Sequence, residues 1–515
     1  MRTSFSRSSL FLVASVLVVA AGYRVPAARA QVGCEATGST ALSGTSTRIG
    51  QVLDLRIDGP PSSPFALFGA FDPGPTGTPF GPICVSTNPG PPAKFRILIN
   101  SIQGPGPTLD GSGSFTLSRP VPNLPGLVGR AFYLQAGTSQ GGVVLSNSLT
   151  LIVGESGTHR GILNDMTEPR TLHSVDLLAD GDVLITGGGG GSLSAPQASS
   201  SANVYSTAFK EVRATAGNMN NARALHASAV LPGGRVLVCG GVNSNGFVHA
   251  TAEEYDPTTD LFTLVGSMNT PRAGHSVCLL DDGRVLVVGG TTTFADSTMA
   301  FENAQNTAEI YDPVAQLFTP VVATLSEARL LHTATLLQDG RVLIAGGVKD
   351  AGFLGLPSLA TGGELFDPTG DSFSAAGALD TTRAGHGAIR LPDGRVLLAG
   401  GINGIASAQA DAELFTVGSG FAGTGSLPSA KAGVEMTLLP DGSVLETGGL
   451  SGSLIAPLGV ATASIYSGGV FVPTGSLTVA RGAHRTISLP DGSVLSIGGA
   501  ADDMTVHDSI DRYYP

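Results

Sequence analysis

Short apolar runs between glycine-rich turns recur along most of this chain. Seven of them share one form, in which an Asp-Gly or Gly-Gly turn precedes a largely apolar run that ends in a Gly-Gly pair. The copies end at Gly188, Gly241, Gly290, Gly347, Gly401, Gly449 and Gly499, so the period is 48 to 57 residues. A period near fifty, made of short strands and tight turns, is typical of the blades of a β-propeller. The pattern therefore predicts a ring of seven blades.

The third copy shows how one blade divides into four strands. Residues 276–280 are expected to form an inner strand A, and residues 284–288, apolar at consecutive positions, a strand B buried on both faces. Residues 308–311 predict strand C, and the residues around Phe318 predict strand D.

The connections between these strands predict where a ligand binds. Tight turns join strand A to B and strand C to D, and we call the end of the blades that carries them the turn face. We expect little room for function there. The B-to-C and D-to-A connections are long and variable, as in 291–306, 348–361 and 450–461. Variable loops on a rigid scaffold usually carry binding residues, so a ligand is expected on this opposite end, the loop face.

The two ends of the array predict how the ring closes. The last copy ends at 510–515 with a strand C and no strand D, whereas residues 159–166 precede Pro169 and Arg170 as strand D precedes arginine elsewhere. We therefore expect this N-terminal segment to complete the seventh blade of a propeller that spans 156–515. Closure of this kind removes the exposed edges that an open array would leave.

Residues 31–155 do not share the repeat. Segments 52–57, 95–99, 131–136 and 145–153 alternate or run apolar between turn-rich stretches. They predict a small antiparallel β-sandwich-like module ahead of the propeller, with a role as a spacer or a surface-attachment domain.

The first thirty residues have the features of a signal peptide. Arg2 and Arg7 precede an apolar stretch at 10–21, and small residues flank a cleavage site near Ala30. No later segment is long and apolar enough to cross a bilayer. We expect a mature protein that is secreted, periplasmic or on the cell surface.

Charge and cysteine content narrow the function classes further. The formal net charge of −12, with 13% charged residues, argues against a nucleic-acid partner because an acidic surface repels phosphates. Cys34 and Cys84 are candidates for a disulfide in the N-terminal module. Cys239 and Cys278 are expected to be small core residues.

The double glycine and the later aromatic residue resemble the Kelch repeat over residues 157 to 515. Kelch blades commonly carry Trp in strand D, where this chain has Phe262, Phe318, Phe373, Phe421 and Phe471. The resemblance implies an all-β protein with a seven-bladed Kelch-type propeller, similar to the central propeller domain of galactose-oxidase-like proteins. The secreted bacterial type fits the predicted signal peptide. Propellers host both enzymes and binding proteins, so this resemblance leaves the function open.

Two sets of polar residues recur at the start of strand A on the loop face. The arginines are Arg170, Arg223, Arg272, Arg329, Arg383 and Arg481, and a histidine follows each of them by three residues. The arginines are ligand-binding candidates because a ring of them suits an anionic sugar or a carboxylate. Pairing with a strand-C glutamate in the same blade explains the repetition without a ligand, and we favour that interpretation. No metal is expected at the histidines.

The sixth copy departs from this pattern. It has Lys431 in place of arginine and Ser464 in place of the strand-C acid, with Glu435 in strand A and Glu446 in strand B. A buried glutamate is costly unless it is paired, so Lys431 is expected to neutralise one of these two acids. The alternative makes Lys431, Glu435 and Glu446 candidate catalytic residues with a general acid or base among them.

These observations favour an exported, non-enzymatic recognition or scaffold protein that binds a protein or glycan partner on the loop face, with no cofactor. The alternative is a sugar-modifying propeller enzyme that resembles sialic-acid epimerases or, less well, copper-radical carbohydrate oxidases. Copper-radical chemistry needs a neighbouring Tyr-His pair, and the tyrosines Tyr205, Tyr255, Tyr311 and Tyr466 instead fall in strand C. The ligand and the oligomeric state are left open.

Overall fold

The computed structural model describes the backbone of nine strands between residues 41 and 152. It also describes residues 157–515, apart from 163–164, 193–194, 295–302, 352–356, 405–406, 454–455 and 502–504. Two compact units, Met1–Ser156 and Gly157–Pro515, divide the chain. The predicted signal peptide and Cys34 lie outside the described residues, and only the backbone of Cys84 is described. Among the described residues, no helix is long and apolar enough to span a bilayer.

The described residues of the N-terminal unit form antiparallel strands, as the sequence pattern predicts. One sheet has the order β1-β2-β7, a second has the order β6-β3-β8-β9, and β4 and β5 form a hairpin. The strands are β1 (Ala41–Gly44), β2 (Val52–Asp58), β3 (Phe65–Ala70), β4 (Pro73–Thr78), β5 (Gly81–Val85), β6 (Phe95–Asn100), β7 (Ser114–Pro120), β8 (Ala131–Ser139) and β9 (Val143–Ile152).

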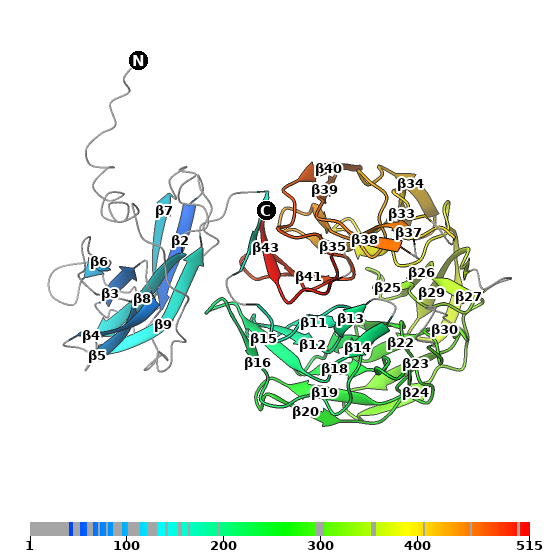
Figure 1. Ribbon diagram of the computed structural model, residues 1–515, viewed down its shortest axis with the longest axis horizontal. Coiled ribbons are helices and arrows are strands. Elements are labelled where there is room, and N and C mark those ends of the chain that lie inside the picture. The colour runs from blue at the N-terminus through cyan, green and yellow to red at the C-terminus, as the bar shows by residue number, and fades with distance from the viewer. Residues whose placement is uncertain are drawn as a thin grey trace, which may run out of the picture. The chain divides into compact units, whose positions relative to one another are not determined.

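The second unit is a ring of seven four-stranded antiparallel sheets (Figure 1). The innermost strands A of neighbouring blades contact one another all the way round, including the last strand and the first. They are β11 (Ser174–Leu177), β17 (Ala227–Val230), β21 (Ser276–Leu279), β25 (Thr333–Leu336), β31 (Gly387–Arg390), β35 (Glu435–Leu438) and β41 (Arg485–Ser488).

Strand B forms the core of every blade, and all four of its residues are buried in each copy. Its apolar side chains point to both faces because a blade lies on either side. These strands are β12 (Val183–Thr186), β18 (Val236–Cys239), β22 (Val285–Val288), β26 (Val342–Ala345), β32 (Val396–Ala399), β36 (Val444–Thr447) and β42 (Val494–Ile497). Cys239 and Cys278 are free thiols in this core, as predicted.

Strands C and D complete each sheet toward its outer edge. The C strands are β15 (Ala202–Ser206), β19 (Ala252–Asp256), β23 (Ala308–Asp312), β29 (Gly362–Asp367), β33 (Ala412–Thr416), β39 (Ala463–Ser467) and β43 (Ile510–Tyr514). The D strands are β10 (Thr158–Gly161), β16 (Glu211–Ala214), β20 (Leu261–Leu264), β24 (Leu317–Pro320), β30 (Ser372–Ala378), β34 (Gly420–Thr424) and β40 (Val470–Thr474).

Phenylalanine does the packing that tryptophan does in many related blades. Phe318 on β24 lies opposite Tyr311 on β23, with ring centroids 4.7 Å apart, and four other blades have the same strand-C and strand-D pair of rings. In the seventh blade His159 takes the place of phenylalanine, 4.8 Å from the ring of Tyr513.

The ring closes through the N-terminal segment, as predicted. β10 pairs with β43 in a sheet of order β10-β43-β42-β41, so one strand from residues 158–161 joins three from the C-terminal end. The seventh blade is therefore built from both ends of the propeller.

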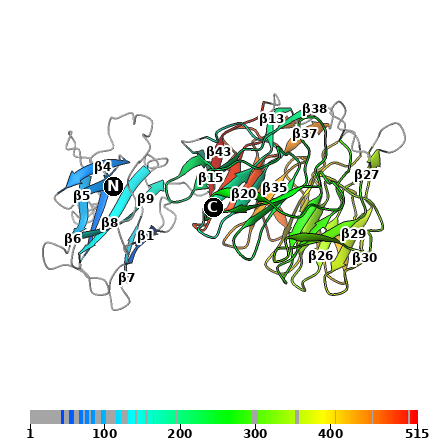
Figure 2. The ribbon, with the colours of Figure 1, turned by 90° about the horizontal axis from the view of Figure 1, so that it is seen from below.

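Three B-to-C connections on the loop face form hairpins of their own. They are β13 (Gly189–Ser192) with β14 (Ala195–Ala198), β27 (Val348–Ala351) with β28 (Pro357–Leu359), and β37 (Leu450–Ser453) with β38 (Ala456–Gly459). Figure 2, which views the propeller from the side, shows β13, β37 and β38 on the same side of it.

The first glycine of each Gly-Gly pair makes room for the next blade. Gly346 has a φ of 63°, and a Cβ there would lie 2.4 Å from the carbonyl oxygen of Arg383 and 2.8 Å from Cε1 of His386. The same close approach of glycine and histidine recurs at five further contacts between neighbouring blades, which we call seams. The double glycine and the histidine of the repeat are therefore two halves of one interblade contact.

We expect Gly346→Ala to lower the free energy of unfolding by about 3 kcal/mol or more, because a buried backbone carbonyl and a wedged imidazole cannot both give way. Gly385→Ala is the matched control at the same seam. Gly385 has a φ of 57°, and a Cβ there would meet nothing within 4 Å. That variant carries only the cost of a left-handed backbone, about 1 kcal/mol. Urea unfolding of both variants checks this prediction, and equal losses would contradict it.

Candidate functional site

The six arginines that precede strand A lie inside the blades. They are at most 1% exposed, namely Arg170, Arg223, Arg272, Arg329, Arg383 and Arg481. In the third blade, Nη1 of Arg272 donates to the carbonyl of Gly289 at 2.8 Å and to that of Thr307 at 3.0 Å. Equivalent bonds recur in the five other blades that carry arginine. The structure thus places these ligand-binding candidates within the framework of the propeller.

Carboxylates pair with these arginines, as predicted. The N–O distances are 2.7, 3.1, 2.7 and 2.6 Å for Arg223–Glu253, Arg272–Glu309, Arg329–Glu364 and Arg383–Glu413. Each carboxylate also holds the segment that leads into strand A. Oε2 of Glu309, for example, accepts from the backbone N–H of Asn269 at 2.7 Å. The carboxylate oxygens used in this way have their partners inside the blade, so the buried charges are paired.

Two acids in this scheme were not foreseen from the sequence. Asp511 lies 3.5 Å from Arg481 and occupies the strand-C position of the glutamates, so alignment of the last copy could have found it. In the first blade that position holds Asn203, and the acid is Glu168, which lies 3.2 Å from Arg170.

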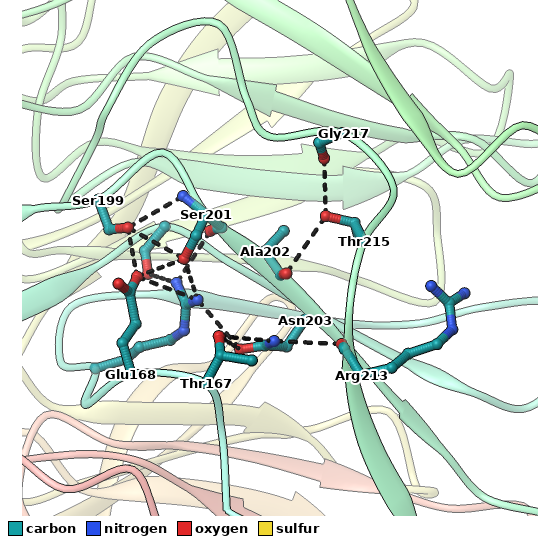
Figure 3. A network of polar contacts seen from close by, with 11 residues as sticks. Thr167, Glu168, Ser199, Ser201, Ala202, Asn203, Arg213, Thr215 and Gly217 are labelled. Atoms are coloured by element: carbon teal, nitrogen blue, oxygen red, sulfur yellow. Dashed lines mark hydrogen bonds and ion pairs between the residues drawn. The ribbon is translucent and has the colours of Figure 1, made fainter. Parts of the chain in front are cut away.

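Figure 3 shows this first-blade arrangement. The hydroxyls of Ser199 and Ser201 donate to the Glu168 carboxylate, and Thr167 exchanges hydrogen bonds with Asn203. Glu168 comes from the segment before strand A rather than from the sheet. No repeat position marks it, so the sequence carries no signal for this acid.

The histidines are buried between blades and are neutral at pH 7. Burial, together with a smaller effect of nearby arginine charges, lowers the pKa of His275 and of His386 to about 3. Burial also holds the pKa of the four others, His173, His226, His332 and His484, well below the usual range. No group of three or more His, Cys, Asp or Glu residues that could hold a metal occurs among the described residues.

In the sixth blade the departures from the repeat form one buried ion pair. Nζ of Lys431 lies 2.7 Å from Oε1 of Glu446, and Ser464 donates to Oε2 of the same carboxylate at 2.8 Å. Lys431 also donates to Oγ1 of Thr462 at 3.1 Å. Burial raises the pKa of Glu446, and Lys431 opposes that shift. Of the two acids that the sequence offered to Lys431, Glu446 is the partner.

The structure separates Glu435 from that pair and places it near the propeller axis. Glu435 and Arg485 are the first residues of β35 and β41, at the loop-face ends of two adjacent innermost strands. Nη1 of Arg485 donates to Oε1 of Glu435 at 2.8 Å, and its Nε donates to the carbonyl of His173 at 3.1 Å. Glu435 is 20% exposed and Arg485 47% exposed, so solvent reaches this pair.

Asp176 adds a second acid to the innermost strands. It lies on β11, is buried, and its Oδ2 has no hydrogen-bond partner. Burial raises its pKa to about 6, while a hydrogen bond from Ser228 and the charge of Arg485 oppose the shift. Sequence reasoning missed both Asp176 and Arg485. The available signal was that both are charged residues within strand A, where most positions are apolar or carry a hydroxyl.

We expect Asp176→Asn to raise the free energy of unfolding at pH 7.5 by about 2–3 kcal/mol. The folded-state pKa lies above the ordinary value of 3.8, so ionised Asp176 opposes folding at high pH, and the penalty fades as the pH falls from 6 toward 4. Asparagine keeps an acceptor for Ser228 without the charge. Chemical unfolding at pH 7.5 and pH 5 checks this, and a destabilised variant at pH 7.5 would contradict it.

The comparisons agree with this geometry on the fold. A family model for the Kelch motif matches residues 223–269, and no curated protein matches the chain. Among solved structures, a fungal alcohol oxidase of the AA5 family in complex with copper is 18% identical, with a TM-score of 0.55, over 70% of this chain and 76% of its own. The structure of YjhT is 17% identical, with a TM-score of 0.44, over 56% of this chain and 93% of its own.

The second unit is therefore a seven-bladed β-propeller, and its second blade matches the Kelch motif. It shares this fold with the galactose-oxidase-like AA5 enzyme. At this level of identity the likeness shows architecture alone.

Among the residues that the structure describes, the donor set does not fit the copper-radical site that a resemblance to galactose-oxidase-like proteins would imply. Tyr255 donates its hydroxyl to Asp260, and Tyr311 donates its hydroxyl to Glu254, both at 2.6 Å. Both tyrosine hydroxyls are therefore engaged within the propeller, and the six histidines that follow the arginines lie at separate interblade contacts around the ring. No step of the proposals below involves a metal.

Proposed function

We propose that this protein is an exported recognition protein whose propeller binds a protein or glycan partner on its loop face. The observation that carries the proposal is Phe247, which is 63% exposed in the B-to-C loop of the second blade. An exposed aromatic side chain on a rigid loop is typical of a binding anchor.

The loop around Phe247 is held in place by its own hydrogen bonds. Asn243 donates its backbone N–H to the carbonyl of Phe247 at 3.0 Å, and Oδ1 of Asn243 accepts from the N–H of Phe247 at 3.0 Å. The ring stands edge-on to His249, with centroids 5.4 Å apart. A side chain ordered in advance loses little entropy on binding. Of the other loop aromatics, Phe294 is buried in a small core, and Phe301 and Phe353 lie outside the described residues.

The test compares Phe247→Ala with Phe209→Ala. Phe209 is 41% exposed in the C-to-D turn of the first blade, on the turn face, and serves as the matched control. Residues 31–515 are immobilised and presented with a glycan library and with surface proteins of the source organism. We expect Phe247→Ala to weaken binding of the partner about tenfold or more. Phe209→Ala should leave the affinity unchanged. Equal retention by both variants would reject a loop-face site.

A second candidate is a sugar-modifying enzyme, favoured by Asp176, Glu435 and Arg485 near the axis. Burial among the innermost strands raises the pKa of Glu435, and Arg485 opposes that shift. Two acids with raised pKa values beside an exposed guanidinium suit general acid–base chemistry on a carboxylated sugar. NMR of sialic acid and related sugars during incubation with the protein tests this proposal. Turnover that survives Glu435→Gln would exclude this acid.

A further inference from the structure

A cavity of about 710 Å³ opens between the second and third blades on the turn face. Two A-to-B turns, at 231–235 and 282–284, and the C-to-D turn at 312–314 line it. The expectation that tight turns leave little room on this face is therefore wrong at this seam. Ligand sites in proteins have volumes in this range.

The first reason for the cavity is a missing turn acid. Gly233 stands where the six other A-to-B turns carry aspartate, namely Asp180, Asp282, Asp339, Asp393, Asp441 and Asp491. In those turns the carboxylate accepts the backbone N–H two residues later, as Asp282 does from Arg284 at 3.0 Å. A Cβ on Gly233 would meet nothing within 4 Å. The space that aspartate would use is open.

The second reason is an acid in place of an aliphatic residue. Glu254 lies in strand C, where the corresponding residues are Val204, Ile310, Leu365, Leu414, Ile465 and, in the seventh blade, Arg512. Arg284 pairs with its own turn acid, Asp282, at 2.7 Å. Arg235 has no such acid and reaches Glu254 instead, at 3.0 Å. In the second blade, the carboxylate that pairs with this arginine is therefore at the floor of the cavity, whereas in the third blade it is in the turn.

The floor of the cavity is the buried carboxylate of Glu254, which already accepts a hydrogen bond from the phenol hydroxyl of a tyrosine side chain. Glu254 is 3% exposed, and its Oε2 accepts from Arg235 and from Gln316, both at 3.0 Å. Its Oε1 accepts the hydroxyl of Tyr311 at 2.6 Å. A carboxylate has about four acceptor positions, so Glu254 has one left for a ligand.

The walls favour a neutral ring over an ion. Leu231, Pro232, Pro313 and Val314 are apolar, and the guanidinium groups of Arg235 and Arg284 are partly exposed at the cavity. Each of these guanidinium groups has a carboxylate partner. Asp312 also lines the cavity, and its Oδ1 already accepts from the backbone N–H groups of Val314 and Ala315, so each charged group of the lining has a partner within the protein. Planar guanidinium groups and prolines suit the face of an aromatic ring.

We propose that this cavity binds a phenol, with its ring against the prolines and guanidinium groups and its hydroxyl donating to Glu254. The phenol comes either from a tyrosine side chain of a partner protein or from a free phenolic compound. The site is independent of the loop face and of any partner bound there.

The probes are p-cresol for the free compound and N-acetyltyrosinamide with a tyrosine-containing peptide for the side chain. Toluene and N-acetylphenylalaninamide are the matched ligands without a hydroxyl. We expect p-cresol to bind the full mature chain about tenfold or more tightly than toluene, because a hydrogen bond to a charged acceptor is worth about that factor. Tighter binding of the peptide than of p-cresol would assign the site to a partner protein, and the reverse to a free phenolic compound.

Two variants remove the site by restoring the repeat. Gly233→Asp refills the turn. Glu254→Ile restores the aliphatic strand-C residue and is made together with Tyr311→Phe, so that no buried hydroxyl loses its acceptor. Both changes reproduce residues found in other blades. We expect each to weaken p-cresol at least tenfold, while Phe247→Ala on the loop face leaves it unchanged. If a variant does not fold, the alternative experiment is to soak a crystal of the natural protein with p-cresol. The phenol oxygen should then lie within hydrogen-bond distance of Glu254. Equal binding of p-cresol and toluene, no binding, or binding that survives Glu254→Ile with Tyr311→Phe would overturn the proposal.

Discussion

Acidification from pH 7 to pH 5 is expected to unfold the propeller. A histidine with a folded-state pKa of about 3, such as His275 or His386, stays neutral in the folded state, whereas its unfolded-state pKa is about 6.5. The unfolded state then binds more protons, so stability falls as the pH drops from 6.5 toward 3. At pH 5, each such histidine lowers the free energy of unfolding by about 2 kcal/mol. His275 and His386 together account for about 4 kcal/mol, and the four other buried histidines, whose pKa values are also lowered, change stability in the same direction. The sum is large beside the 5–15 kcal/mol that usually holds a domain together.

Calorimetry or urea unfolding at pH 7, 6 and 5 checks this prediction. The window above pH 5 separates the histidines from most carboxylates, which titrate lower. His275→Val is the matched variant, because the sixth blade carries Val434 at the same position. As the pH falls, we expect the unfolding free energy of this variant to decrease less steeply than that of the natural protein. The difference in slope should be about 1.4 kcal/mol per pH unit. An unchanged slope would show that protonation of His275 is not a cause.

Removal of the Glu446 charge is expected to cost about 3–5 kcal/mol of unfolding free energy, because it leaves the Lys431 ammonium buried without its partner. The two side chains are at most 1% exposed, so solvent does not replace the lost interaction. Glu446→Gln is the change, and unfolding in urea at pH 7.5 is the measurement.

A triple variant serves as the control for this loss. Lys431→Arg with Glu446→Val and Ser464→Glu rebuilds the arginine and strand-C glutamate pair of the other blades. We expect it to recover most of the stability that Glu446→Gln loses. If Glu446→Gln leaves stability unchanged but abolishes ligand binding or turnover, Glu446 is a functional residue rather than a framework group.

The propeller was predictable because its signal is local and repeated. Asp-Gly turns and short apolar runs specify each hairpin, and the predicted strand B at 284–288 is observed as Val285–Val288. Closure by the N-terminal segment was also predictable, since the last copy lacks a strand that residues 158–161 supply. Pairing of arginine with the strand-C glutamate followed from their joint repetition.

The candidate site was less predictable, because it depends on which side chains meet across blades. Lys431 had two acids nearby in the sequence, and only the direction of each side chain shows that it contacts Glu446. Glu435 instead meets Arg485, fifty residues further along the chain. Asp176 joins them near the axis from the opposite end of the propeller sequence.

The sequence by itself determined the all-β class, the seven blades, the closing strand and the framework ion pairs. The strands and the framework ion pairs depend on residues within one repeat, where spacing fixes which side chains face each other. The closing strand follows from the count of strands, because the last copy lacks the one that residues 158–161 supply. Only the tertiary structure decided the partner of Glu435, the burial of Asp176 and the cavity floored by Glu254. These features form where one blade meets the next, and Glu254 is bound by Tyr311 and Gln316 of the neighbouring blade. Each seam is formed by residues of two repeats, so the sequence of one repeat does not show which side chains meet there.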